Sequence, residues 1–323
     1  MNKYGVVFSG QGAQKPGMGK SLYETSPAAR EVFDRAGDEI KYDCFEADTD
    51  RLKQTEVTQP AVYTMDIAAY AALREALGEG DDDFVEPSGM AGFSLGEYAA
   101  FTAAGSIGSF EEGLVLVKIR SLLMQAAGTG SMAAGIGNRD AVLALVEMTK
   151  GEDILEAVNF NGPQQTVVAG DVTAVERFTA MAAGDRGLGV KAIPLSVSGA
   201  FHSTLMRPAA NGLAEALTNF SFTEPSYPVY LNVTGGPYEE YAEVAVGSAS
   251  SKLRALMVCQ MQSPVQWQHT VERMADDGIK TIIEVGPGKT LTGLIKKIAP
   301  ELAALNVEDS KSLAETIEQV RNS

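Results

Sequence analysis

A serine stands between two glycines in the stretch Gly92-Phe93-Ser94-Leu95-Gly96. The G-x-S-x-G pattern is typical of a nucleophile elbow, a sharp turn between a strand and a helix that exposes the serine hydroxyl. Glycines suit this turn because a Cβ on either side would collide with the next element. Backbone N–H groups at the start of the helix can hold a developing negative oxygen. The pattern predicts a serine nucleophile at Ser94, with a turn that carries no chemistry as the alternative.

A general base for this serine can come from only two histidines, His202 and His269. His202 follows a predicted strand and a glycine, and it directly precedes a helix predicted over 203–218. The positive end of a helix disfavours the imidazolium ion and helps to keep a base neutral at pH 7. His269 lies in a polar helix, where we expect a surface position. His202 is therefore the predicted base.

One arginine lies within an apolar helical stripe. The S-x-x-E form of Ser109–Glu112 is that of a capping box and predicts a helix that extends to about Ala127. At helical spacing, Arg120 shares a face with Leu116, Val117, Leu123, Met124 and Ala127. A guanidinium does not lose its proton, so burial of this face requires an anion beside it. That anion is either a protein carboxylate or the carboxylate of a substrate.

Composition excludes several classes of protein. The chain has 323 residues and a net charge of −16, whereas a nucleic-acid surface needs a cationic footprint. An anionic small substrate needs only local Arg or Lys. Cys44 and Cys259 form no disulfide or zinc pattern, and both thiols are expected to be buried. We see no signal peptide and no apolar run of roughly 18 residues, so we expect a cytoplasmic protein without a membrane partner.

Two glycine-rich segments resemble phosphate-binding loops, but each lacks a required residue. The predicted strand Tyr4–Phe8 leads into Ser9-Gly10-Gln11-Gly12, yet Lys15 occupies the third glycine position of GxGxxG. Gly288-Lys289-Thr290 could end a P-loop, but Ile283 occupies its first glycine position. A dinucleotide or triphosphate site is therefore disfavoured, and the first loop could instead bring backbone donors to the end of a neighbouring strand.

The remaining pattern predicts one large α/β domain with a small domain inserted into it. Within 131–197 the predicted order is β-α-β-β-α-β, the ferredoxin-like arrangement. The large domain then comprises 1–130 and 198–323, and we expect a parallel sheet that carries the elbow. Helices are predicted over 18–41, 59–77, 96–104 and 290–298, and strands over 190–197, 227–233 and 279–285.

Several motifs together resemble the malonyl-CoA:acyl-carrier-protein transacylase family of bacterial fatty acid synthesis, to which polyketide synthase acyltransferase domains are related. The similarity covers nearly the whole chain, in the stretches 8–14, 92–98, 128–134, 199–203, 264–267 and 284–288. This resemblance implies a hydrolase-like α/β core with a ferredoxin-like insertion. It also places the nucleophile on Ser94, the base on His202, and the oxyanion donors on the backbone N–H groups of Gln11 and Leu95.

The resemblance also assigns the buried arginine and the group that orients the base. It implies that Arg120 binds the malonyl carboxylate, and that the carbonyl of Gln260 replaces the aspartate of a catalytic triad. The residues around His202 resemble members that take malonyl rather than branched groups. One departure is Phe93, because many members have histidine directly before the serine. Phe93 changes the polarity expected at the pocket.

The implied activity is ping-pong transfer of a malonyl group from coenzyme A to the phosphopantetheine thiol of acyl carrier protein. No cofactor and a monomer are expected. Carrier proteins are acidic, so an acidic enzyme needs a local basic patch, for which the candidates are Lys191, Lys289, Lys296 and Lys297. The alternatives are a trans-acting polyketide acyltransferase, a serine hydrolase, or a scaffold without activity. A hydrolase is disfavoured because no HGGG-like loop or triad acid is evident, and Asp277-Gly278 is a faint match to Ser-Asp enzymes.

Overall fold

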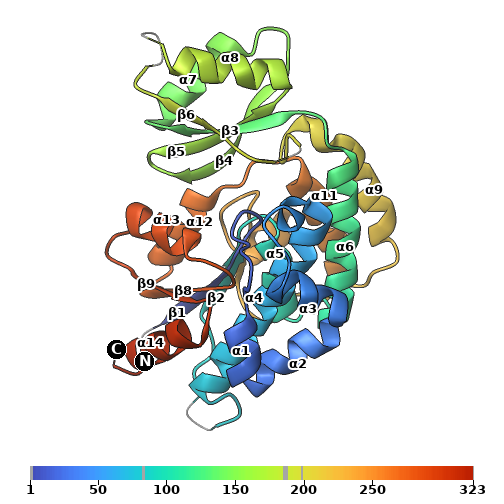
Figure 1. Ribbon diagram of the computed structural model, residues 1–323, viewed down its shortest axis with the longest axis vertical. Helices are drawn as coiled ribbons and strands as arrows, with labels where there is room; N and C mark the ends of the chain where they lie inside the picture. Colours follow the sequence, from blue (N-terminus) through green and yellow to red (C-terminus); the bar gives the residue numbers. More distant parts are fainter. Residues whose placement is uncertain (1–2, 82–83, 185–187, 198, 323) are drawn as a thin grey trace.

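The computed structural model describes residues 3–81, 84–184, 188–197 and 199–322 (Figure 1). It contains a five-stranded parallel sheet in the order β7-β2-β1-β8-β9 and a separate four-stranded antiparallel sheet in the order β4-β5-β3-β6. The parallel strands are β1 (Tyr4–Phe8), β2 (Gly89–Gly92), β7 (Val229–Tyr230), β8 (Thr281–Val285) and β9 (Ala303–Val307). The protein is therefore of the α/β class.

The parallel sheet lies between two helical layers. All residues of β1 and β8 are buried, as expected for strands covered on both faces. Val6 and Phe8 pack into the hydrophobic cluster that includes α4, α5 and α6, whereas Val7 packs into the cluster that includes α12 and α13. These helices are α4 (Thr55–Leu77), α5 (Gly96–Ala103), α6 (Phe110–Ala126), α12 (Trp267–Asp276) and α13 (Thr290–Ile298).

The segment between α6 and α9 forms the antiparallel sheet and its own core. Its elements are β3 (Ser131–Ile136), α7 (Arg139–Thr149), β4 (Leu155–Gly162), β5 (Gln165–Gly170), α8 (Val172–Ala182) and β6 (Lys191–Pro194). Figure 1 shows α7 and α8 on the side of this sheet that faces away from the parallel sheet. Strand β4 reaches the rest of the molecule at Val265, whose N–H donates to the Val158 carbonyl over 2.8 Å. The predicted order β-α-β-β-α-β is therefore observed.

The remaining helices pack mainly on other helices, and the last of them also covers β9 at the edge of the parallel sheet. They are α1 (Lys20–Thr25), α2 (Pro27–Ala36), α3 (Asp38–Phe45), α9 (Arg207–Leu217), α10 (Tyr238–Val244), α11 (Ala249–Met261) and α14 (Ser310–Arg321), with 3-10 turns at Arg51–Lys53 and Thr204–Met206. None of the helices in the described ranges is both long and apolar enough to cross a membrane.

Four sequence predictions need correction. The helix predicted over 18–41 is three helices, because Ser26 and Pro27 start a new one and Gly37 has a φ of 91°. The strand predicted over 227–233 is only Val229–Tyr230, because the chain beyond it turns to bring Asn232 to the elbow. The strand predicted over 190–197 is only Lys191–Pro194, an exposed edge strand, and residue 198, the predicted domain boundary, lies outside the described residues. Cys44 is buried as predicted, whereas Cys259 is exposed on α11.

A buried acid in α4 gives a testable consequence for stability. Asp66 is fully buried, and among the described residues neither of its carboxyl oxygens has a hydrogen-bond partner. A Cβ on Gly286 would lie 1.9 Å from Asp66 Oδ1, so the carboxyl is packed tightly against that glycine. Burial, and then the nearby Glu284 carboxylate, raise the pKa of Asp66 well above its ordinary value.

We expect Asp66→Asn to stabilise the protein at neutral pH. The unfolded chain ionises Asp66 near pH 4, while the folded chain keeps it neutral, so the wild type loses stability as pH rises by up to about 1.4 kcal/mol per unit. The variant has no such loss. Denaturant unfolding between pH 3.5 and 8 should show a stability gain that grows with pH and vanishes near pH 4. A difference that does not change with pH would contradict this account.

Candidate active site

Ser94 lies in a strained turn between β2 and α5. Its φ is 53°, a left-handed value that is rare for a residue with a side chain. A Cβ on Gly92 would lie 1.9 Å from the Gly96 carbonyl carbon, and one on Gly96 would lie 2.2 Å from the Phe8 oxygen. Both glycines are therefore required by close backbone contacts, as the sequence pattern predicted. The turn holds the Ser94 hydroxyl at the carboxyl end of the sheet, where ligands of open parallel sheets bind.

His202 lies beside Ser94 and is oriented by Gln260. The distance from His202 Nε2 to Ser94 Oγ is 2.7 Å, and Nδ1 lies 3.0 Å from the Gln260 carbonyl oxygen. A carbonyl can only accept, so Nδ1 carries the proton and Nε2 accepts from the serine. Burial, and then the positive charge of Arg120, lower the pKa of His202 to about 4. The imidazole is therefore neutral at pH 7, while His269 is exposed on α12.

Arg120 is completely buried, and its guanidinium points at the serine. Its Nη2 donates to Ser94 Oγ over 3.0 Å, and its Nη1 donates to Gln59 Oε1 over 2.8 Å. The guanidinium carbon lies 5.1 Å from the centre of the Tyr98 ring. No ion pair joins Arg120 to a carboxylate within the part of the chain that the structure describes. The burial of Arg120 could require either a protein carboxylate or a substrate carboxylate. In the described part of the chain, no protein carboxylate binds Arg120 directly.

Two backbone N–H groups beside the serine are available as donors. In the described ranges, neither the Gln11 nor the Leu95 amide hydrogen has an acceptor in the protein. The Gln11 side chain is fixed by Thr55 and Gln59 of α4, with both hydrogen bonds 3.2 Å long. The loop after β1 and the first turn after Ser94 are therefore held in place while their amides stay free. Free donors of this kind are what an oxyanion hole requires.

Sequence reasoning missed two buried polar residues that hold the elbow. Asn232 Oδ1 accepts from the Ser94 N–H over 2.7 Å, and its Nδ2 donates to the Gly92 carbonyl over 2.6 Å. Glu97 accepts from the Asn232 N–H and from Gln260 Nε2, each over 2.6 Å. Glu97 was visible inside the serine motif, and Asn232 follows a predicted strand. Neither position has a pattern that would have indicated its partner.

Phe93 packs against an aromatic ring near the serine. Its ring centre lies 5.6 Å from that of Trp267, in an edge-to-face arrangement. A Cβ on Gly10 would lie 2.6 Å from the Phe93 carbonyl oxygen, so the loop after β1 passes directly over this residue. The departure noted in the sequence thus places an apolar surface next to the nucleophile.

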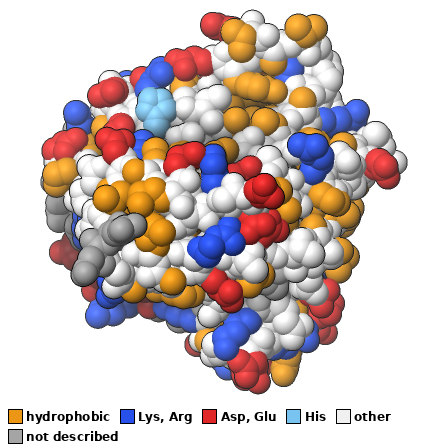
Figure 2. All heavy atoms as spheres, turned by 90° about the horizontal axis from the view of Figure 1, so that it is seen from above, with side chains coloured by type: hydrophobic (Ala, Val, Ile, Leu, Met, Phe, Trp, Pro, Cys, Tyr) orange, Lys and Arg blue, Asp and Glu red, His pale blue; other side chains and the backbone are white. Residues whose placement is uncertain are grey.

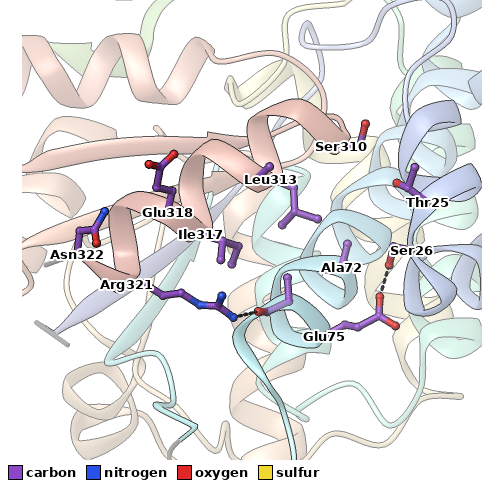
Figure 3. A pocket seen from close by; sticks show the side chains of 12 residues that line it. Thr25, Ser26, Ala72, Glu75, Ser310, Leu313, Ile317, Glu318, Arg321 and Asn322 are labelled. Atoms are coloured by element: carbon purple, nitrogen blue, oxygen red, sulfur yellow. Dashed lines mark hydrogen bonds between the residues drawn. The ribbon is translucent and has the colours of Figure 1, made fainter.

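A surface cavity of the described chain lies away from the serine. It has a volume of about 770 Å³ and lies between α4, α14 and the junction of α1 with α2 (Figure 3). Two hydrogen bonds already join polar side chains of its lining, because Ser26 donates to Glu75 over 2.5 Å and Arg321 donates to the Ala76 carbonyl over 3.2 Å. None of the residues that hold Ser94 and His202 lines it. It therefore plays no part in the site.

A serine activated by a neutral histidine can accept an acyl group, and comparison with known proteins agrees with acyl transfer. A family model described as an acyl transferase domain matches residues 6–322. The chain belongs to the acyl transferase family. This acyl transferase is 38% identical over 321 residues to the malonyl CoA-acyl carrier protein transacylase of Haemophilus influenzae, with 97% of each chain covered.

Other relatives of this acyl transferase carry the same name. The transacylase of Escherichia coli K12 is 38% identical over 329 residues, which cover 98% of this chain and all of that one. The crystal structure of the Clostridium perfringens transacylase superposes with a TM-score of 0.88 at 36% identity, covering 99% and 98% of the two chains.

Two further matches come from polyketide synthesis. One is a malonyl-transacylase solved in complex with its type II polyketide synthase acyl-carrier protein, with a TM-score of 0.87, 35% identity, and 98% and 99% of the two chains covered. The other is the polyketide biosynthesis protein ThaF of Burkholderia thailandensis, 38% identical over 311 residues, which cover 94% of this acyl transferase and 25% of ThaF.

Proposed function

We propose that the protein transfers a malonyl group from coenzyme A to the phosphopantetheine thiol of acyl carrier protein through a malonyl-serine intermediate. One observation carries this proposal: Ser94 Oγ lies 2.7 Å from a neutral imidazole and 3.0 Å from a buried guanidinium that has no ion pair among the described residues. The first contact activates a nucleophile, and the second offers a site for a carboxylate on the acyl group.

The first half-reaction forms the acyl-enzyme. His202 Nε2 takes the proton of Ser94, whose oxygen attacks the thioester carbonyl carbon of malonyl-CoA. The N–H groups of Gln11 and Leu95 stabilise the oxyanion. When this tetrahedral intermediate collapses, the C–S bond breaks. The proton passes from His202 to the departing sulfur, so coenzyme A leaves as a thiol. The Gln260 carbonyl keeps the imidazole in the required tautomer throughout.

The second half-reaction runs the same steps in reverse. His202 takes the proton of the carrier-protein thiol, the sulfur attacks the ester carbonyl, and the proton returns to Ser94 as the ester bond breaks. Arg120 binds the free carboxylate of the malonyl group in both halves and so disfavours acetyl groups. The reaction needs no metal or cofactor, and malonyl-CoA is a substrate.

The division of the chain into two domains is part of the same proposal. We assign residues 1–130 and 198–323 to a hydrolase-like α/β domain with a nucleophile elbow, and residues 131–197 to a ferredoxin-like domain inserted into it. The parallel sheet, the left-handed turn at Ser94 and the observed β-α-β-β-α-β order favour this assignment. A cytoplasmic monomer remains our prediction.

Fatty acid synthesis is the acceptor pathway that we propose, because full-length relatives named malonyl CoA-acyl carrier protein transacylase match over nearly the whole chain. The similarity to ThaF and to the type II polyketide transacylase supports a polyketide acceptor as the second candidate. The two are distinguished by comparing kcat/KM for carrier proteins of the two pathways from the source organism. A higher kcat/KM for the polyketide carrier protein would make polyketide synthesis the first candidate pathway.

Intact mass after brief exposure to malonyl-CoA tests the activity. We expect one malonyl adduct per chain, which a phosphopantetheinylated carrier protein discharges. Acetyl-CoA under the same conditions should label the protein far less. Release of free malonate without transfer would indicate a serine hydrolase instead, and the absence of any adduct would indicate a protein without activity.

Four exposed lysines are the candidates for a surface that binds the carrier protein. Lys297 of α13 lines a cavity with Ile136, and Ile136 pairs with Lys191 of β6, so these two lysines flank one region. Together with Lys289 and Lys296 they are exposed and free of ion pairs within the described residues. In Figure 2, Lys and Arg lie scattered among Asp and Glu over the face seen from above, so an acidic partner needs a local patch.

Charge reversal at Lys296 and Lys297 should therefore raise KM for carrier protein by about tenfold, because rim charges mainly affect association. Malonyl adduct formation from malonyl-CoA, measured by mass, should remain close to that of the wild type. Lys311→Glu serves as the control, since Lys311 is an exposed lysine on α14 that is paired with Glu315. Unchanged carrier-protein kinetics would exclude this patch.

A further inference from the structure

The charge of Arg120 is offset by a carboxylate that does not touch it. Arg120 Nη2 donates to Gln260 Oε1 over 3.3 Å, and Gln260 Nε2 donates to Glu97 Oε2 over 2.6 Å. Glu97 is only 1% exposed, and it lies on α5 directly below the elbow. The Gln260 amide thus presents its oxygen to the cation and its N–H group to the anion. It connects the two charges while keeping them apart.

This spacing has a chemical consequence. A buried charge needs a balancing charge, because transfer from water into the protein interior is costly. A carboxylate bonded directly to Arg120 would occupy the guanidinium N–H groups and compete with a substrate carboxylate. A carboxylate one amide further away lowers the cost of burial but leaves the guanidinium beside Ser94 open.

We propose that Glu97 is the charge-balancing and positioning residue for Arg120 before substrate binds, and that Glu97 takes up a proton when a malonyl group binds. This inference rests on the proposed malonyl transfer. A malonyl carboxylate beside Arg120 brings a second negative charge into the same buried region, and neutralisation of Glu97 removes the surplus. An acetyl group brings no charge and causes no such uptake.

The same carboxylate also positions the groups that react. Its Oε1 accepts from the Asn232 N–H, and the Asn232 side chain holds the backbone of the elbow on both sides of Phe93. Through Gln260 it reaches the base as well, because the Gln260 carbonyl accepts from His202 and the Gln260 side chain donates to the Ser94 carbonyl over 2.8 Å. Glu97 therefore fixes the nucleophile, the base and the arginine from one point.

The surroundings of Glu97 allow the change of protonation near neutral pH. Burial raises the pKa of Glu97 to about 7, opposed by the hydrogen bonds from Asn232 and Gln260 and by the charge of Arg120. Among the described residues, the other titratable groups near it are Tyr98, which stays neutral because burial raises its pKa to about 12, and His202. Since Arg120 keeps its proton and His202 is neutral above about pH 5, Glu97 is the group left to respond.

Proton uptake can be measured directly with Ser94→Ala, which should bind malonyl-CoA without reacting. Titration calorimetry at pH 7 in phosphate and in imidazole buffer gives the number of protons taken up from the difference in enthalpy. We expect a net uptake of up to one proton per malonyl-CoA, supplied to the ionised fraction of Glu97. Acetyl-CoA should give none. Equal uptake for both ligands would overturn the proposal.

Kinetics of the wild type and Glu97→Gln provide the second readout. In the wild type, the malonyl to acetyl ratio of kcat/KM should fall about fivefold or more between pH 5.5 and 8.5, the size of a usual coupling between sites. In Glu97→Gln the ratio should not change with pH. If Glu97 had a purely structural role, Glu97→Gln would lower kcat/KM equally for both donors and would leave the pH dependence of their ratio unchanged. If no malonyl adduct forms at all, the proposed function fails; if it forms and the wild-type ratio is flat, only this inference fails.

Discussion

Ser94→Ala is expected to abolish the malonyl adduct and to lower kcat/KM for malonyl transfer by about 10⁴-fold or more, as loss of a serine nucleophile does in comparable enzymes. The reason lies in the geometry, because Ser94 Oγ is the group that both His202 and Arg120 approach within 3.0 Å. Without that oxygen, no covalent intermediate can form. Intact mass and steady-state transfer to carrier protein measure the two effects.

A matched variant separates the nucleophile from its surroundings. His202→Ala should cost a similar factor, because an unactivated serine is a poor nucleophile, and the double variant should be no worse than either single one. Binding of malonyl-CoA to Ser94→Ala should persist, because Arg120 retains its hydrogen bonds to Gln59 and Gln260. Adduct formation in Ser94→Ala would mean that another residue is the nucleophile.

The site residues found from sequence are those whose side chains leave a local pattern. Ser94 was indicated by its two glycines, and the structure shows the backbone contacts that require them. His202 was indicated by its place between a predicted strand and a predicted helix, and the structure shows that the other histidine is exposed, as expected. Arg120 was indicated by its place in an apolar stripe, and its complete burial confirms the premise of that argument.

Other site residues have no such pattern. The roles proposed for Gln11, Leu95 and the Gln260 carbonyl use backbone atoms, which every residue has, so only the family resemblance indicated these residues. Glu97 and Asn232 act through hydrogen bonds between segments that are distant in the chain and meet only in the folded sheet. Side-chain periodicity cannot indicate such partners.

The same limit applies to the fold. The order of helices and strands followed from apolar runs and turn residues, but the length of β7 did not. Tyr227–Val233 reads as a strand because it is rich in aromatic and β-branched residues. The chain leaves the sheet at Leu231 because the Asn232 N–H and side chain bond to Glu97 and to the elbow instead. A functional contact thus overrides the local preference for a strand.

Arg120→Ala is expected to lower the malonyl to acetyl ratio of kcat/KM by about 10²- to 10³-fold, which corresponds to loss of a buried charge pair of roughly 3–4 kcal/mol. Malonyl transfer falls because its carboxylate loses the guanidinium beside Ser94. Acetyl transfer is spared or rises, because a neutral methyl group no longer meets a buried cation. Both donors are measured in single-turnover acylation at pH 7.

The ratio is the decisive quantity because Arg120→Ala also removes the partner of Gln59, Gln260 and, through Gln260, Glu97. Any loss of folded protein or of elbow geometry lowers kcat/KM for malonyl-CoA and for acetyl-CoA by the same factor, so it cancels in the ratio. Arg120→Lys is the matched control, since it keeps the charge but not the planar fork, and we expect an intermediate ratio. An equal loss for malonyl and acetyl would show that Arg120 supports the structure of the site without binding the malonyl carboxylate.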